Sequence, residues 1–311
     1  MRGPFAALLA AFLFGLSATI AKLVGGDVGP FFIGGIMTLS ASMVFVVAWA
    51  AGLRFAPDTV QPHEPGAAKG AFGLDRTSWK LLAGVTISGG FFAPALFFSG
   101  VLLRNSASTS SLLLISEPAL TILLAYILLR ERMSAREYAI AFLMLIAAVV
   151  VATDLDFQKV DVATIGAGLV ILSGLCWAID NNCSTPLSRR ADLLVVVGLK
   201  AFLGGSALTL LSLAVEGVPS PRAETVALLL AGGVATVAVA VLAFLYAFRK
   251  IGAMRGGALF ATTTLFGAAT AVVVLGEPLS ILQIGSAVVM LVASVALAVW
   301  AKDAGPRPAP V

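Results

Sequence analysis

The chain alternates long apolar stretches with short polar connections over almost its whole length. Each apolar stretch is about 20 residues long, which is what an α-helix needs to cross the roughly 30 Å hydrocarbon layer of a membrane. The pattern therefore predicts an all-α integral membrane protein with ten transmembrane helices. The expected spans are Phe5–Val24, Phe31–Leu53, Trp79–Leu103, Ser106–Leu129, Ala135–Thr153, Ala163–Ser184, Leu193–Val215, Thr225–Phe248, Arg255–Leu275 and Leu279–Trp300.

The fourth expected span carries a carboxylate, Glu117, followed directly by Pro118. If this span is one continuous helix, Glu117 lies about 17 Å from its start, near the middle of the membrane. An ionised side chain costs at least about 2.5 kcal/mol at that depth, so we expect Glu117 to face a cavity or a polar partner and not lipid. The polar residues that share its helical face are Ser106, Ser110 and Thr121. Glu117 is thus a candidate substrate or proton site, with a purely structural carboxylate as the alternative.

The sequence around this span returns 146 residues later, which indicates an internal repeat. Leu129–Ser134 matches Leu275–Ser280, and Thr263 stands in the second copy where Glu117 stands in the first. The second copy therefore keeps a polar face without its charge.

Basic residues lie predominantly on one side of the expected spans. Fifteen of the 20 Lys and Arg residues fall on one side and four on the other, with Lys200 inside a span. Because Lys and Arg concentrate in cytoplasmic loops, both termini are expected in the cytoplasm.

Five helices per copy mean that the second copy enters the membrane from the opposite side, so the repeat is inverted. The expected units are repeats at 5–153 and 163–300, a cytoplasmic loop at 54–78 and a cytoplasmic tail at 301–311.

The sixth span has a polar cluster near its cytoplasmic end. Trp177 and Asn181 are one helical turn apart, so they share a face that could stack against a polar ligand and hydrogen-bond to it. Interface anchoring is the alternative for this pair. Asp180 lies beside them, and Lys200 in the next span could approach Asp180 if its side chain extends towards the cytoplasm.

Four further residues have candidate roles that the sequence leaves open. Lys22 ends the first span and could extend to the membrane surface or contribute to a site. Pro94 is expected to bend the third span, as a passive kink or as a hinge. Glu131 and Glu277 follow the fourth and ninth spans, where we expect tertiary hydrogen bonds that shape the adjoining loops.

Composition excludes several functional classes. The chain is 59% hydrophobic and only 12% charged, with a mean hydropathy of +1.03. Its net charge of +4 is distributed over loops and forms no aromatic-interleaved patch, so nucleic acid is not an expected partner. Two cysteines, Cys176 and Cys183, and one histidine, His63, in a polar loop provide no metal or haem ligand set. An intramembrane protease would need a deeply placed histidine or two aspartates, so we expect neither an enzyme nor a cofactor.

Taken in order along the chain, these motifs are similar to those of EamA-type permeases of the drug/metabolite transporter superfamily. The resemblance rests on Phe14-Gly15 with Lys22, Ser116-Glu117-Pro118, Leu129-Arg130-Glu131-Arg132, Cys176-Trp177-Ala178 and Leu275-Gly276-Glu277-Pro278, and it covers residues 5 to 300. Three features depart from the family pattern: Phe14 replaces a frequent Trp, Thr263-Thr264 replaces a second Glu-Pro, and the 54–78 loop is long.

The resemblance implies secondary transport of small metabolites or amino acids across the cytoplasmic membrane by alternating access, often outward. Protons are a candidate coupling ion through Glu117, and the cavity is expected to involve spans one, three, four, six, eight and nine. A non-transporting membrane sensor or scaffold is the alternative. Substrate identity and oligomeric state are not indicated by the sequence.

Overall fold

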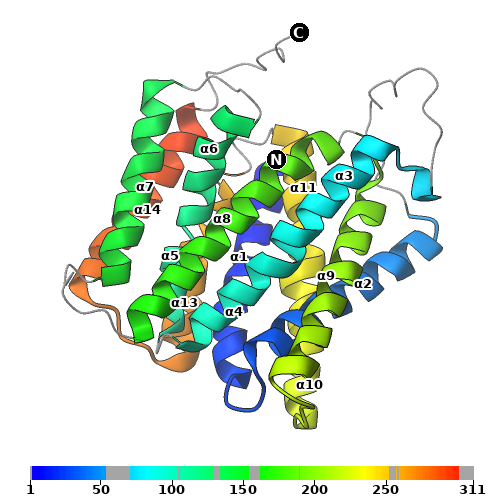
Figure 1. Cartoon of the computed structure of the whole chain (residues 1–311). Coiled ribbons are helices and arrows are strands. Elements are labelled where there is room, and N and C mark those ends of the chain that lie inside the picture. Colours follow the sequence, from blue (N-terminus) through cyan, green and yellow to red (C-terminus); the bar gives the residue numbers. More distant parts are fainter. Residues whose placement is uncertain are drawn as a thin grey trace.

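The computed structural model describes residues 2–53, 71–103, 106–128, 134–153, 162–188, 190–251, 257 and 259–300, and every regular element in these residues is a helix (Figure 1). The α-helices are α1 (Arg2–Val24), α2 (Pro30–Ala50), α3 (Arg76–Val85), α4 (Ala93–Leu103), α5 (Ala107–Leu113), α6 (Ser116–Leu128), α7 (Ala135–Thr153), α8 (Val162–Ser188), α9 (Leu193–Val215), α10 (Ala223–Gly233), α11 (Ala240–Ile251), α13 (Thr263–Leu275) and α14 (Ile281–Trp300). Three short sections complete them: η1 (Ala71–Gly73), η2 (Thr86–Phe92) and η3 (Val234–Val239). His63, Glu131, most of the predicted loop and the predicted tail lie outside the described residues.

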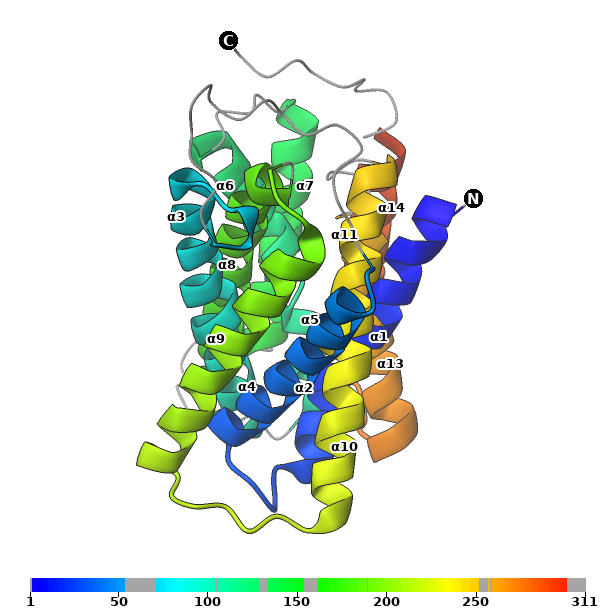
Figure 2. The same ribbon diagram turned by 90° about the vertical axis from the view of Figure 1, so that its right-hand side faces the viewer.

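Six helical stretches in the described residues are long and apolar enough to cross a membrane. They are Gly3–Val24, Pro30–Ala50, Arg76–Leu103, Thr164–Ser184, Leu193–Val215 and Ala223–Ala247. Three further apolar helices are shorter: Tyr138–Ala152, Thr263–Leu275 and Ile281–Ala296. The chain is thus an integral, multi-pass, all-helical membrane protein. Figures 1 and 2 show that the first turn of α1 and the last turn of α14 lie towards the same end of the bundle.

The described part of the predicted span Ser106–Leu129 is not one continuous helix. Helix α5 ends at Leu113 and α6 begins at Ser116, with a turn between them. Pro118 has no N–H to donate to the carbonyl of Leu114, and that carbonyl accepts instead from the amide of Glu117 at 3.0 Å. The i→i−3 bond tightens the winding of the chain between α5 and α6. As a result, Glu117 lies in the first turn of a new helix, and the polar face inferred for one helix is divided between two.

The predicted third span also starts earlier than expected and changes its winding. Helix α3 begins at Arg76 because the Asp75 side chain accepts from the Ser78 amide at 2.7 Å and caps the helix. It continues through the π-helical section η2 into α4, where Pro94 follows. A corresponding π-helical section, η3, joins α10 to α11 in the second half of the chain. Each π-helical section widens the long helix that contains it, and the two sections lie at similar distances from the starts of those helices.

The two halves of the described chain contact each other in matched pairs. Helix α1 packs against α13 and α11, and α8 packs against α6 and α4. Helix α2 packs along α9, and α7 packs along α14. Small residues allow the close crossings: a Cβ added at Gly15 would lie 2.8 Å from the backbone N of Gly267, and one at Gly174 would lie 3.1 Å from the backbone N of Glu117.

Carboxylates from one half cap helix N-termini of the other. Glu277 accepts from the amides of Ala107 and Ser108, each at 2.7 Å, and from the Ser106 hydroxyl at 3.0 Å. This confirms the predicted tertiary role of Glu277. Burial alone would raise the pKa of its carboxyl, but these hydrogen bonds outweigh burial and hold the pKa below its usual value. Glu277 therefore stays ionised at neutral pH, as an acceptor for α5 amides requires.

A second interhalf cap lies in the α1–α2 connection. Asp27 accepts from the Thr225 hydroxyl at 2.6 Å and the Arg222 amide at 3.0 Å, at the start of α10. These bonds, the one from Thr225 foremost, lower the pKa of Asp27 from its ordinary value. Its ion pair with Arg222, whose side chain is 71% exposed, is solvated and contributes little by itself.

Candidate functional site

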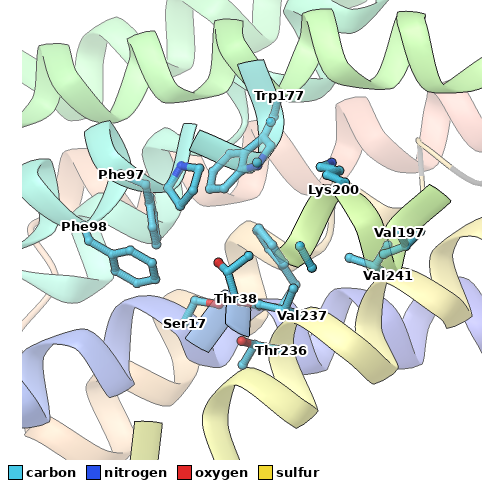
Figure 3. Close-up of a pocket in the computed structure, with 15 residues that line it drawn as sticks. Ser17, Thr38, Phe97, Phe98, Trp177, Val197, Lys200, Thr236, Val237 and Val241 are labelled. Carbon is cyan, nitrogen blue, oxygen red and sulfur yellow. Dashed lines mark hydrogen bonds between the residues drawn. The ribbon is translucent and has the colours of Figure 1, made fainter. Parts of the chain in front are cut away.

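A cavity of about 80 Å³ lies between the two halves of the described chain (Figure 3). Its lining residues belong to α1, α2, the η2–α4 segment, α8, α9 and the η3–α11 segment. The lining residues are Phe14, Ser17, Thr38, Gly89, Gly90, Pro94, Phe97, Phe98, Trp177, Val197, Lys200, Ala201, Thr236, Val237 and Val241. Four of the six spans expected to line the cavity do so: spans one, three, six and eight. The described residues of the other two expected spans, four and nine, contribute no lining residue, and spans two (α2) and seven (α9) line the cavity instead.

Three aromatic rings form one wall of this cavity. The rings of Phe14 and Trp177 meet edge-to-face with centroids 5.4 Å apart, and Phe97 lies 5.5 Å from Trp177 at a tilted angle. Edge-to-face packing is a favoured aromatic geometry, and each ring belongs to a different helix. The wall therefore depends on α1, α4 and α8 together. Pro94, at the start of α4, lines the cavity as well.

Lys200 is the charged residue among those that line the cavity. Its ammonium forms an ion pair with Asp180 of α8, whose side chain is 7% exposed, so the pairing left open by the sequence is formed. The other carboxylate oxygen of Asp180 accepts from the Ser184 hydroxyl at 3.1 Å. Gly89 makes this arrangement possible, because a Cβ at that position would collide with the Asp180 carboxylate.

Glu117 lies beside the cavity and not in its lining, and its carboxylate meets a polar partner, which is one of the two arrangements expected from the sequence. The side chain is buried between α6 and α8, and its Oε1 accepts from Asn181 Nδ2 at 3.0 Å. The same amide nitrogen lies 3.4 Å from the Thr121 hydroxyl. Glu117 also interacts electrostatically with Asp180 and Lys200. The Lys200–Asp180 ion pair is therefore coupled electrostatically to the buried carboxylate of Glu117 on the neighbouring helix α6.

The neighbouring amide, Asn182, holds α8 to the broken span. Its Nδ2 donates to the carbonyl of Thr121 at 3.2 Å and to that of Ala178 at 2.8 Å. Asn182 is buried, so these two bonds satisfy an otherwise costly group. The polar cluster of the sixth span thus has two faces: Trp177 lines the cavity, while Asn181 and Asn182 bind α6.

Hydroxyl groups line the side of the cavity opposite Trp177 in Figure 3. They belong to Ser17 of α1, Thr38 of α2 and Thr236 of η3. Sequence reasoning missed all three, because a single hydroxyl in an apolar helix is a weak signal. Thr236 could have been found from its place in the second long helix, at the point that corresponds to Gly89–Gly90 in the first.

Two predicted site residues lie away from the cavity lining. Thr263, buried at the start of α13, donates to the carbonyl of Ala11 at 2.5 Å and so ties α13 to α1. Lys22, in the last turn of α1, interacts electrostatically with Glu277. The structure therefore brings together Glu117, Pro118, Trp177, Asp180, Asn181, Lys200 and Pro94 around the cavity and its flank, and separates Thr263 and Lys22 from them.

Within the described ranges, no group of three or more His, Cys, Asp or Glu side chains is placed to hold a metal ion. Cys176 and Cys183 are unpaired thiols, both partly exposed in the same helix. The groups that line the site offer hydrogen bonds, an ion pair and apolar contact.

Comparison with known proteins gives three concordant findings. A model of the EamA-like transporter family matches residues 1–153 and 164–300. An uncharacterized transporter from Methanothermobacter thermautotrophicus (strain ATCC 29096 / DSM 1053 / JCM 10044 / NBRC 100330 / Delta H) is 30% identical over 292 residues, which cover 93% of this chain and 84% of that protein. A protein of known crystal structure superposes with a TM-score of 0.69 over 99% of this chain and 100% of that one. Since that protein is only 16% identical, its likeness concerns the fold.

Proposed function

Because the chain belongs to the EamA-like transporter family, we propose that it is a carrier that moves a small metabolite across the cytoplasmic membrane by alternating access. The observation that carries this proposal is the cavity between the two halves, which combines an aromatic wall, hydroxyl groups and one buried ion pair. Such a combination of apolar surface with few, well-placed polar groups is typical of small-molecule sites.

In this proposal ten spans form two inverted repeats, at 5–153 and 163–300. The matched contacts of α1 with α13 and of α8 with α6, together with the paired π-helical sections η2 and η3, support the repeat. The excess of basic residues on one side supports cytoplasmic termini. Rocking of one half against the other around the cavity would expose it to each side in turn.

Roles follow for the predicted site residues. Trp177 contacts the substrate. Lys200 supplies an ammonium group that can exchange Asp180 for a group on the substrate as its ion-pair partner. Glu117, buried next to this pair and bonded to Asn181, is the proposed proton carrier. Pro118 and Pro94 keep the two helices irregular where they approach the site, while Thr263 and Lys22 hold the surrounding helices. Outward transport driven by proton exchange completes the proposal.

Counterflow in proteoliposomes tests this function. Vesicles loaded with an unlabelled compound are expected to accumulate the same labelled compound, for at least one member of a panel of acids, amines, amino acids and nucleosides. Glu117→Gln is expected to lower that exchange at least about tenfold, the effect of about 1.4 kcal/mol on one step, and to remove its dependence on pH.

Glu224→Gln is the matched control, because Glu224 is exposed at the start of α10, away from the cavity. It is expected to exchange like the native protein. Full exchange by Glu117→Gln at every pH would contradict the proposed proton role. An absence of exchange for every compound would contradict transport and favour a sensor or scaffold.

A further inference from the structure

The described part of the cavity lining contains a cation and no acid. Lys200 lines the cavity, whereas Asp180 and Glu117 lie behind the lining and already accept hydrogen bonds from Lys200, Ser184 and Asn181. A cationic ligand would therefore meet a like charge and no free carboxylate. An anionic ligand would meet an ammonium group directly.

The ammonium of Lys200 has bonding capacity to spare. It carries three donors, and in the described residues its hydrogen-bond partner is a single carboxylate oxygen of Asp180. Its side chain is 19% exposed, in a lining that is otherwise mostly apolar. A charge-assisted hydrogen bond in such surroundings is stronger than one in water. The remaining donors are thus well suited to an incoming carboxylate.

A second, independent observation also indicates a ligand. Thr236 lines the same cavity, is 0% exposed, and its Oγ1 has no hydrogen-bond partner among the described residues. A buried hydroxyl without a partner is unfavourable, and this one lies on η3, a section whose irregular winding allows small shifts. An acceptor atom on a ligand would satisfy it.

The dimensions of the cavity restrict the apolar part of the ligand. Its volume of about 80 Å³ is smaller than the roughly 150 Å³ cavity that holds benzene in an engineered protein. A compact aliphatic group therefore fits against Phe14, Phe97 and Trp177 with less rearrangement than a ring would require.

We propose that this cavity binds a compound that carries a carboxylate on a compact apolar body: the carboxylate pairs with Lys200, the body packs on the aromatic wall, and a second oxygen accepts from Thr236. The inference rests on the proposed function, since it names the substrate class of the same cavity. It narrows the small metabolites or amino acids that the family resemblance implied to those with a carboxylate.

Isothermal titration calorimetry of the full chain in lipid nanodiscs tests the proposal with five probes on one carbon skeleton. They are 3-methylbutanoate, its amide, the corresponding amine, 3-methyl-2-oxobutanoate and valine, whose branched apolar group is smaller than a benzene ring. The acid is expected to bind at least about tenfold more tightly than the amide, because one charge-assisted hydrogen bond is lost, and the amine is expected not to bind saturably. The keto acid is expected to bind about fivefold more tightly than the plain acid through Thr236. Valine distinguishes the two sources of the carboxylate: binding as tight as that of the plain acid identifies an amino acid, and binding weaker than that of the plain acid identifies a free acid.

Variants show which residues produce these differences in affinity. Lys200→Met combined with Asp180→Asn removes both charges, leaves no unpaired ion, and is expected to bring acid and amide within about twofold of each other. Thr236→Val is expected to remove only the additional affinity of the keto acid. Ser294→Ala is the control, because the buried Ser294 hydroxyl on α14 also has no hydrogen-bond partner among the described residues and lies away from the cavity lining.

Equal affinity for acid and amide, tighter binding of the amine, or binding of none of the probes would overturn the proposal. Counterflow of the same probes separates it from the proposed function. Binding of the acid without exchange would contradict transport and leave the carboxylate site standing. Exchange of some other compound without a preference for acids would contradict the site and leave transport standing.

Discussion

The Gly204→Leu substitution is expected to destabilise the protein by about 3 kcal/mol or more, or to prevent recovery of folded protein altogether. Gly204 of α9 crosses Gly90 of η2 so closely that a Cβ would lie 2.6 Å from the Gly90 carbonyl carbon and 2.9 Å from its Cα. Backbone cannot yield as a flexible side chain does. The whole of α9 would have to move away from η2, and Lys200, one helical turn earlier, would move with it.

Thermal unfolding in detergent, followed by size-exclusion chromatography with fluorescence detection, measures this effect. Gly84→Leu is the matched control, since Gly84 also lies within a helix but a Cβ there would meet nothing within 4 Å. The control is expected to melt close to the native protein. Equal melting temperatures for the two variants would contradict the close crossing of η2 and α9.

The second large effect concerns the ion pair beneath the cavity. Lys200→Met is expected to cost about 3–5 kcal/mol, because it leaves the Asp180 carboxylate buried without its counter-ion. Asp180→Asn is expected to be milder than Lys200→Met, since the partly exposed ammonium can still reach water. The double variant is expected to be more stable than Lys200→Met alone, because a buried pair replaced as a whole leaves no isolated charge.

The same melting assay on the two single variants and the double variant gives the coupling energy. Arg222→Gln serves as the control: its pair with Asp27 is solvated, and the variant is expected to melt close to the native protein. A double variant that loses the sum of the two single losses would show that Lys200 and Asp180 do not interact.

Much of the helical framework could be predicted from the apolar pattern. Helices α7 and α9 have the predicted bounds, Ala135–Thr153 and Leu193–Val215, because polar or turn-forming residues flank a predominantly apolar run on both sides. The early start of α3 was missed because the cap formed by Asp75 lies within a polar segment, where hydropathy carries no signal.

The site was only partly predictable, for a different reason. Glu117 and Pro118 are conspicuous by their chemistry, but which way the carboxylate faces depends on the break between α5 and α6. A helical wheel assumes that no such break exists. The hydroxyls of Thr38 and Thr236 gain their meaning only from the tertiary crossings that bring α2 and η3 to one cavity.

Alternating access, the central element of the proposed function, is tested most directly by thiol labelling from each side of the membrane. Ser17→Cys places a thiol in the cavity lining of a chain whose Cys176 and Cys183 are replaced by serine, and Ser294→Cys is the control outside that lining. A membrane-impermeant reagent applied to right-side-out and to inside-out vesicles is expected to modify position 17 from both sides, and position 294 from neither. Modification of position 17 from one side only, under every condition of pH and substrate, would contradict alternating access.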